Sequence, residues 1–359
     1  MVALLYLFLV GVSTIEAGIR AMGSDFQDGL LESVNNPLAG LFAGVLATVL
    51  VQSSSVTTST IVGLVGSGTM TVEAAVPMIM GANIGTTITN TLAALGHLRR
   101  SEEFRRAFTA ATMHDFFNIL AVMIFFPLEL MTGFLTVLSE KLADLVAGNV
   151  SGGTTSSPIK DAVKAPVGSI EDAVGVVTDV EILAGSLLLA IGLGLIFLAL
   201  ASLSRNMRTL IAGRIETMMN SAVAKGGGIV GLATGLVVTV GVQSSSITTS
   251  IVVPLVGSGV LGVRNAFPIT LGANIGTTMT ALLASLAVDL RVGLVIALHH
   301  VLFNVIGVAV LFPIPWFRNT PVLLAERLAD LAVKRRMTVG IYVIGLFLIV
   351  PLTGIVILR

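Results

Sequence analysis

Long apolar runs dominate this chain and restrict the folds open to it. Seven of them reach the roughly 20 residues that a helix needs to cross a bilayer. They cover residues 1–22, 72–95, 104–134, 181–203, 263–288, 291–316 and 336–358. Charged residues make up only 11% of the sequence, against about 25% in soluble domains. Because only helices and closed barrels satisfy their backbone in lipid, the sequence predicts an all-α polytopic membrane protein.

Two further apolar regions, 38–68 and 229–259, carry the polar tetrapeptide QSSS in their middle. Each is too short for two crossings, which need roughly 40 residues plus a turn, and long for a single one. We expect a re-entrant helical hairpin in each, which enters the bilayer, breaks at the serines and returns. The predicted fold has about seven full spans plus two hairpins.

The distribution of positive charge indicates the orientation. With the hairpins non-crossing and the N-terminus inside, 14 of the 20 Lys and Arg fall on the cytoplasmic side. This predicts a multi-pass plasma-membrane protein with a cytoplasmic N-terminus and a retained first span. The net charge of zero argues against nucleic acid as a partner, and the absence of cysteine excludes disulfides and thiolate metal sites.

The chain contains an internal duplication. Residues 52–93 align with 243–284 at a constant offset of 191, with 26 of 42 positions identical, and HDFFN at 114–118 matches HVLFN at 300–304. Each half contains three crossings and one hairpin. Because the number of crossings is odd, the second half lies upside down relative to the first, and inverted-topology repeats are typical of secondary transporters. The expected domains are a first repeat (1–147), an outside, flexible linker loop (148–180), a second repeat (181–317), and a cytoplasmic segment with the last span (318–359).

The hydroxyl-rich hairpin tips suit a small anion. The second helix of each hairpin begins at the serines, and a helix N-terminus carries free N–H donors and about half a positive charge. Two such ends meeting near the midplane would bind a dianion such as phosphate without an arginine. The residues predicted to bind it are Ser53, Ser54, Ser55, Ser244, Ser245, Ser246, Asn83 and Asn274.

Neutral oxygens near the hairpin tips suit Na⁺, which accepts amide, hydroxyl and carbonyl ligands. The residues predicted to bind it are Gln52, Thr57, Thr58, Thr86, Gln243, Thr248, Thr249 and Thr277. No transition-metal site and no cofactor besides this coupling ion is expected. Intramembrane Asp115 stays open between ion coupling and a structural role. An enzyme is not expected, because His114 and Asp115 are adjacent and make a poor relay toward a serine.

Glycines accompany these motifs. The pairs Gly40/Gly44 and Gly231/Gly235 have GxxxG spacing, and we expect them to pack the two halves of each hairpin together. The glycines of the repeated GANIGTT segments are expected to allow close backbone approach or local unwinding.

The paired QSSS motifs, followed by GANIGTT and, after the first copy, by EFRRAF and HDFFN, resemble the type II sodium-dependent phosphate cotransporter family. The likeness runs from the first span to about Phe312. It implies Na⁺-coupled uptake of inorganic phosphate by alternating access, with Gln52–Ser55 and Gln243–Ser246 lining the sites. The short, cysteine-free outside loop suggests a bacterial member.

Some features stay open at this point. Electrogenic animal members carry an aspartate in the loop before the EFRRAF-like segment, whereas this loop reads GHLRRSEE. The number of sodium ions per phosphate therefore stays open. The oligomeric state also stays open, with a homodimer as one possibility. The alternatives are a sodium-coupled symporter of another oxyanion, such as sulfate or arsenate, and a membrane phosphate sensor or regulator.

Overall fold

The computed structural model describes residues 2–23, 29, 36–148, 158–224 and 228–358, and this part of the chain is helical without strands. The helices before the linker are α1 (Val2–Ala21), α3 (Pro37–Val51), α4 (Ser54–Gly66), α5 (Val72–Gly85), α6 (Ile88–Ala94), the 3-10 turn η1 (Leu95–His97), α7 (Ser101–Thr132) and α8 (Phe134–Gly148). The others are α9 (Pro158–Val177), α10 (Glu181–Ala224), α11 (Gly228–Val242), α12 (Ser245–Gly257), α13 (Val263–Thr277), α14 (Met279–Ser285), α15 (Leu290–Leu311), α16 (Pro315–Lys334), α17 (Met337–Ile344), the π-helical η2 (Gly345–Ile349) and α18 (Val350–Leu358).

Six helical segments of the described chain are long and apolar enough to cross a membrane. They are Val2–Ala21, Ser101–Thr132, Glu181–Met207, Val263–Ser285, Leu290–Leu311 and Met337–Leu358. The chain is thus an all-helical, multi-pass membrane protein. Of the about seven predicted spans, the run 72–95 is not among these six.

The missing span is the run 72–95, which is divided between α5 and α6. The helix stops at Gly85, and the Thr86 hydroxyl then donates to the Ala82 carbonyl oxygen at 2.8 Å. The Thr87 hydroxyl donates to the Ile84 carbonyl oxygen at 2.9 Å. Threonine hydroxyls that bond back to the preceding turn compete with the backbone ladder. The second copy has the same bonds at Thr277 and Thr278, where α13 gives way to α14, so both copies are interrupted at the threonine pair.

Glycines bring two pairs of helices into backbone contact. A methyl group added at Gly44 would overlap the carbonyl oxygen of Met78, and one at Gly235 would overlap that of Ile269. Each GxxxG pair therefore packs α3 on α5 or α11 on α13, and the expectation that it joins the two halves of one hairpin is wrong. In the same interfaces Gly81 lies on Leu41, and Gly272 on Leu232 in the second copy.

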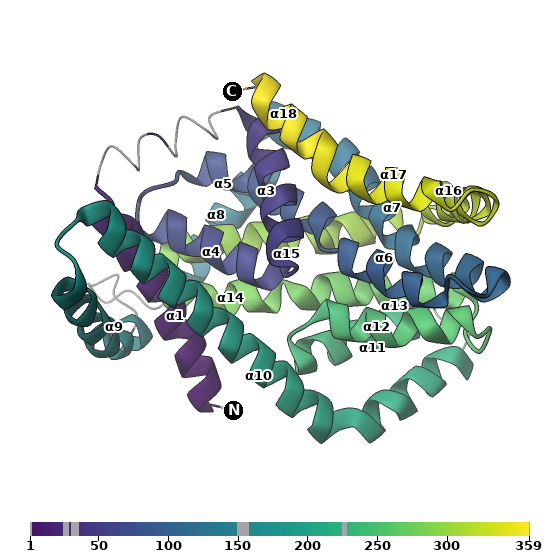
Figure 1. Ribbon diagram of the computed structural model, residues 1–359, viewed down its shortest axis with the longest axis horizontal. Coiled ribbons are helices and arrows are strands. Elements are labelled where there is room, and N and C mark those ends of the chain that lie inside the picture. Colours follow the sequence, from purple (N-terminus) through teal and green to yellow (C-terminus); the bar gives the residue numbers. More distant parts are fainter. Residues whose placement is uncertain (1, 24–28, 30–35, 149–157, 225–227, 359) are drawn as a thin grey trace.

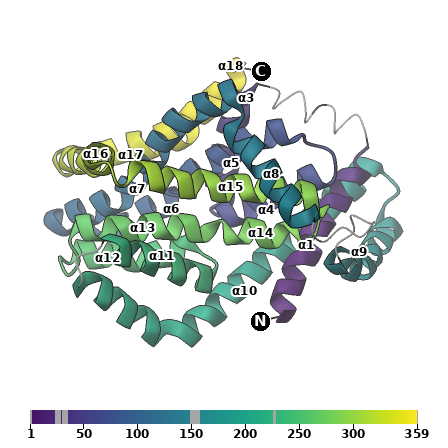
Figure 2. The same cartoon turned by 180° about the vertical axis from the view of Figure 1, so that it is seen from behind.

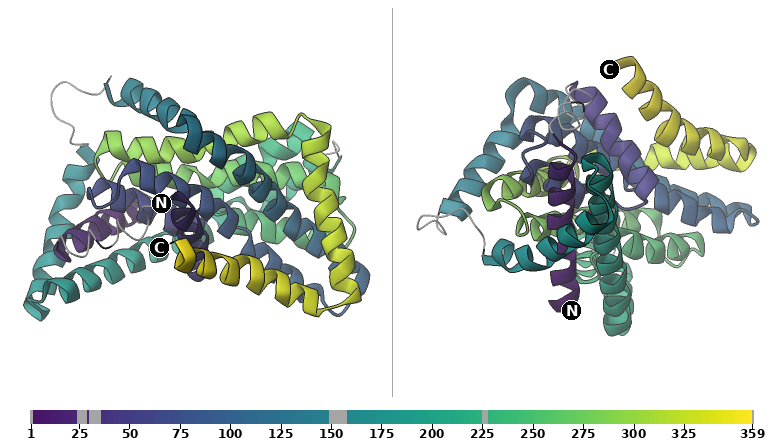
Figure 3. Two further views of the ribbon diagram at one scale, coloured as in Figure 1. Left: turned by 90° about the horizontal axis from the view of Figure 1, so that it is seen from above. Right: turned by 60° about the vertical axis from the view of Figure 1, so that its left-hand side comes forward.

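The remaining helices surround these pairs. α1 and α10 lie side by side at one end of the molecule, and α9 lies outside them (Figure 1). α15 and α13 run through the middle, and α17–α18 lie along the edge opposite the start of α1 (Figure 2). Seen from above, α16 crosses the other end, and α17 and α18 turn back along one side (Figure 3).

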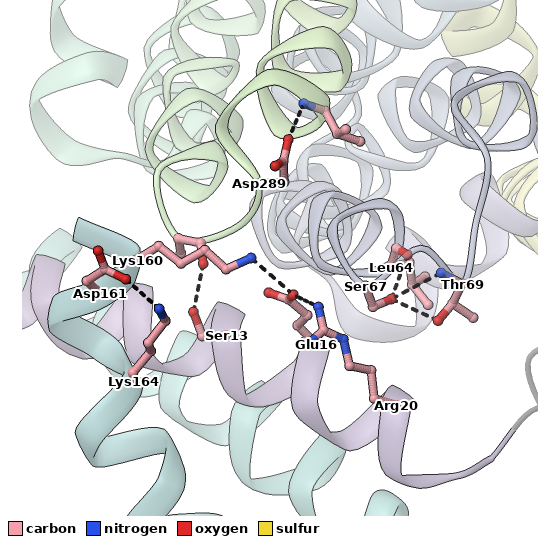
Figure 4. Close-up of polar contacts among 12 residues, drawn as sticks. Ser13, Glu16, Arg20, Leu64, Ser67, Thr69, Lys160, Asp161, Lys164 and Asp289 are labelled. Carbon is pink, nitrogen blue, oxygen red and sulfur yellow. Dashed lines mark hydrogen bonds and ion pairs between the residues drawn. The ribbon is translucent and has the colours of Figure 1, made fainter. Parts of the chain in front are cut away.

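The predicted linker loop is helical over most of its length. Residues 158–177 form α9, whose Val163 and Val167 pack on Val10 of α1. Lys160 approaches the buried carboxylate of Glu16 at 3.4 Å, and Arg20 pairs with the same carboxylate (Figure 4). Apolar residues spaced three or four apart make this segment amphipathic. The Gly- and Ser-rich part, 149–157, lies outside the described residues.

We expect Gly81→Ala to destabilise the protein by about 1–3 kcal/mol, because its methyl group would push the backbone of α3 away from α5. The measurement is the Tm of the detergent-solubilised full chain. Gly96→Ala is the matched control, since a methyl group there meets nothing within 4 Å. Equal Tm values for the two variants would contradict the close packing.

Candidate functional site

Both QSSS motifs form a break between two helices, with the same geometry. Gln52 separates α3 from α4 and Gln243 separates α11 from α12, at φ values of 56° and 54°. They are the non-glycine residues with positive φ in the described part of the chain, a conformation that costs free energy for a residue with a side chain. The side-chain amide of each glutamine offsets part of this cost with a hydrogen bond to the preceding helix. Gln52 Nε2 donates to the Val49 carbonyl at 2.6 Å, and Gln243 Nε2 donates to the Val240 carbonyl at 2.7 Å.

The serines start the helix after each break. Ser53 caps α4 by accepting from the Val56 N–H at 3.3 Å, and Ser244 caps α12 by accepting from the Ile247 N–H at 3.4 Å. The first N–H groups of each helix have no acceptor within that helix. Each serine cluster therefore combines free backbone donors with the positive end of a helix dipole.

The two clusters lie in one cavity of about 400 Å³, although 191 residues separate them in sequence. Its lining consists of Gln52, Ser53, Ser54, Ser55, Val56, Thr89, Phe197, Leu200, Ala201, Ser204, Arg205, Gln243, Ser244, Ser245, Ser246 and Ile247. Within the described residues, the hydroxyls of Ser54, Ser245 and Ser246 have no hydrogen-bond partner, although Ser54 and Ser245 are buried residues. The cavity thus offers unused hydroxyls from both halves of the chain.

Two threonines that were not predicted as site residues hold the side chains of the glutamines in place. The Thr89 hydroxyl of α6 donates to Gln52 Oε1 at 3.3 Å, and the Thr280 hydroxyl of α14 donates to Gln243 Oε1 at 3.2 Å. Thr280 also contacts the Ser55 hydroxyl at 3.3 Å, which joins the two halves. Their position in the repeat was the available signal, since 89 and 280 both hold threonine at the offset of 191.

The threonines predicted to bind sodium lie behind the cavity, outside its lining. Each hydroxyl has a protein partner. Four of the hydroxyls donate to a backbone carbonyl oxygen of the preceding turn: Thr57 to Ser53, Thr58 to Ser55, Thr86 to Ala82 and Thr277 to Ala273. The other two contact side chains: Thr248 the Thr239 hydroxyl, and Thr249 the Asn90 side-chain oxygen. Except at Thr248, where either hydroxyl of the pair with Thr239 can donate, their protons are used within the protein. The oxygens keep lone pairs that can accept.

Asn83 and Asn274 lie apart from the serines, in a buried asparagine network that does not line the cavity. Asn274 Nδ2 donates to Asn118 Oδ1 at 2.9 Å and to Asn304 Oδ1 at 2.7 Å. Asn304 Nδ2 in turn donates to Asn83 Oδ1 at 3.1 Å, and His300 Nε2 lies 3.4 Å from the same oxygen. These amides connect the broken segments α5 and α13 to the long helices α7 and α15. Their predicted role in phosphate binding stays a prediction, since neither asparagine is in the cavity lining.

A cation also lines the cavity. Arg205 of α10 contributes to the lining beside Ser204, and its side chain is exposed. Ser204 donates to the Val242 carbonyl at 2.9 Å, which places this part of α10 against the second break. The sequence predicted an anion site without an arginine, so Arg205 in this lining was not expected.

The sequence is similar to proteins of one known family. The Na+/Pi-cotransporter family profile matches residues 7–144 and 195–314. The mouse (Mus musculus) sodium-dependent phosphate transport protein 2A is 32% identical over 424 residues, covering 98% of this chain and 66% of that protein. The human (Homo sapiens) protein 2B is 32% identical over 437 residues, covering 97% and 63%.

The chain thus spans about two thirds of the length of these relatives. No solved structure is significantly similar to it. The family profile covers well over half of the chain, including both serine clusters and both GANIGTT segments. The protein belongs to the type II Na⁺/phosphate cotransporter family.

Proposed function

We propose that this protein is a secondary active transporter that couples the uptake of inorganic phosphate to sodium. The observation that carries the proposal is the shared cavity, into which two serine-bearing helix N-termini, one from each half, both open. The names of the relatives, sodium-dependent phosphate transport proteins 2A and 2B, support the same substrate and the same coupling ion.

In the proposed architecture the two halves are inverted repeats with re-entrant hairpins. α3, α4, α11 and α12 are apolar but have 13 to 15 residues each, about 20–23 Å at 1.5 Å per residue. They are too short for the roughly 30 Å hydrocarbon core, which favours hairpins that turn back at the serines. The bias of Lys and Arg favours a cytoplasmic N-terminus in the plasma membrane, and inverted repeats support alternating access around a central site.

Phosphate binding in the cavity would use backbone and hydroxyl groups. Free N–H groups at the starts of α4 and α12 donate to phosphate oxygens, and the two helix dipoles favour its negative charge. The Ser54 and Ser245 hydroxyls can donate to an unprotonated oxygen or accept from a P–OH group. Because neutral donors bind less firmly than buried ion pairs, the site can also release its anion, as transport requires.

Sodium would bind beside the serines, on neutral oxygens of the two breaks. Gln52 and Gln243 contribute amide oxygens, and the buried threonines behind them contribute hydroxyl oxygens. A cation next to the anion offsets its charge in a low-dielectric site. Its inward gradient supplies driving energy, about 2.3 kcal/mol per net charge per 100 mV plus the concentration term.

The function is tested by uptake of labelled phosphate into proteoliposomes that contain the full chain. We expect accumulation with an inward sodium gradient and background uptake when choline replaces sodium. Excess sulfate and arsenate are added as competitors, and stronger inhibition by sulfate than by unlabelled phosphate would favour another oxyanion as the substrate. Accumulation that does not depend on sodium would refute the proposal.

Ser54→Ala and Ser245→Ala are each expected to raise the KM for phosphate about tenfold, because a hydrogen bond to a charged ligand contributes about 1.5–3 kcal/mol. Protein yield and Tm should stay at wild-type values, since neither hydroxyl has a partner among the described residues. Ser250→Ala is the control, because Ser250 is exposed and bonds only within α12. Unchanged KM values for phosphate in both variants would show that Ser54 and Ser245 do not bind phosphate.

Arg205→Gln is expected to raise the KM for phosphate a few-fold at low ionic strength and to have less effect at high salt, as for a screened, exposed charge. Lys164→Gln, which changes an exposed lysine of α9 outside the cavity lining, should leave the KM and its salt dependence unchanged. If the effect of Arg205→Gln on the KM did not depend on salt, Arg205 would bind phosphate directly and not merely attract it to the cavity.

A further inference from the structure

A second cavity, separate from the one at the serines, lies where α11, α13 and α16 begin. Its volume is about 230 Å³, and its lining includes Gly228, Arg264, Phe312, Arg318 and Asn319. Gly228 is the first residue of α11, Arg264 the second of α13, and Arg318 the fourth of α16. The cavity thus brings together three helix starts, and it shares no lining residue with the serine cavity.

The charge of this lining is positive. Among the described residues, Arg264 and Arg318 line the cavity without any carboxylate, and neither takes part in an ion pair. The Arg318 guanidinium lies over the Phe312 ring, 5.6 Å from its centroid, which favours one orientation of the planar group. Two guanidiniums and the Asn319 amide are groups that donate readily to phosphate oxygens. The cavity therefore suits a phosphate group.

A cavity between α1 and α9 shows a different arrangement of cations. Its lining includes Arg20 and Lys160, and both pair with the buried carboxylate of Glu16 (Figure 4). Lys164 of the same lining pairs with Asp161. There the protein supplies the anions itself, whereas the cavity on α13 and α16 leaves its two arginines for an anion from outside the chain.

The duplication provides an internal comparison for Arg264. At the offset of 191 it aligns with Glu73 of the first half, so the two copies carry opposite charges at this position. Both side chains are exposed, and α3 packs on α5 as α11 packs on α13. The packing of the repeat therefore does not require a positive charge here, which leaves the guanidinium available for a ligand.

The cavity also lies at the ends of two candidate membrane spans. Arg264 is the second residue of the span Val263–Ser285, and Phe312 directly follows the span Leu290–Leu311. The first turn of α16 carries Trp316, the single tryptophan of the chain, with an exposed side chain. Because tryptophan is enriched where a bilayer meets water, and spans end at the same level, we place the cavity at the depth of the lipid headgroups.

We propose that Arg264, Arg318 and Asn319 bind the phosphate group of an anionic lipid headgroup at the membrane surface. The two guanidiniums and the amide donate to the phosphate oxygens. A headgroup bound there joins the start of α13, which packs on α11, to α16, which packs on α7. In the orientation proposed above, this side is cytoplasmic, where basic pockets between spans bind anionic headgroups. The inference concerns lipid binding and does not depend on transport.

The single tryptophan gives a local test with the full chain in detergent. Phosphatidylglycerol with brominated acyl chains is added, and the quenching of Trp316 fluorescence is compared with quenching by brominated phosphatidylcholine. Both lipids carry a phosphodiester, but phosphatidylcholine has no net charge. We expect half-maximal quenching at an about fivefold lower mole fraction of phosphatidylglycerol. Equal quenching by the two lipids would overturn the proposal.

Arg264→Gln and Arg318→Gln are each expected to raise the mole fraction of phosphatidylglycerol for half-maximal quenching about fivefold, since each removes one cation from the site. Quenching by phosphatidylcholine should stay unchanged, which shows that the tryptophan still reports normally. Arg335→Gln is the matched control, because Arg335 is an exposed arginine at the other end of α16, outside the cavity lining. Wild-type dependence on phosphatidylglycerol in both cavity variants would contradict the site.

Inorganic phosphate offers the same chemistry from a second source, and competition distinguishes the two. Choline phosphate is added to the protein quenched by brominated phosphatidylglycerol, with choline chloride of equal ionic strength as the control. Sodium is left out, so that sodium-dependent binding at the serines does not contribute. We expect phosphate to restore no more Trp316 fluorescence than chloride does. A larger recovery with phosphate would assign the arginines to free phosphate and overturn the lipid as the occupant.

Discussion

The structure depends on how an apolar chain satisfies the backbone at two interrupted helices. At Gln52 and Gln243 the chain adopts a left-handed conformation, which interrupts the helix and leaves backbone groups to be satisfied. The glutamine amide satisfies a carbonyl before the break, and Ser53 or Ser244 caps the helix after it. What remains unsatisfied is a small set of N–H and O–H donors, which are the groups that an anion requires.

Glycine contacts hold these breaks in place. α3 lies on α5, and α11 on α13, with backbone against backbone, which leaves no room for a side chain at the contact. The short helices α6 and α14 then bond to the two glutamines through Thr89 and Thr280. The same construction in both halves brings equivalent serines and glutamines into the lining of one cavity.

The two halves differ at a few buried positions. The first half has Asp115 and Asn90 at positions where the second half has Val301 and Ala281, although the surrounding helices pack alike. Both serine clusters thus come from the duplicated part of the sequence, whereas Asp115 and Asn90 depart from it. Tyr342 of α17, whose hydroxyl donates to Asp115 Oδ2, lies outside the aligned segments.

The sequence by itself determined the helical class, the breaks at QSSS and the duplication, because apolar runs, helix-cap residues and repeated motifs act locally along the chain. It did not predict that α5 ends at Gly85 or that residues 158–177 are helical, since threonine back-bonding and packing on α1 decided these. Only the tertiary structure placed Asn83 and Asn274 in a network apart from the serines and joined Ser55 to Thr280. Such contacts link residues far apart in sequence, so their geometry follows from how the helices pack.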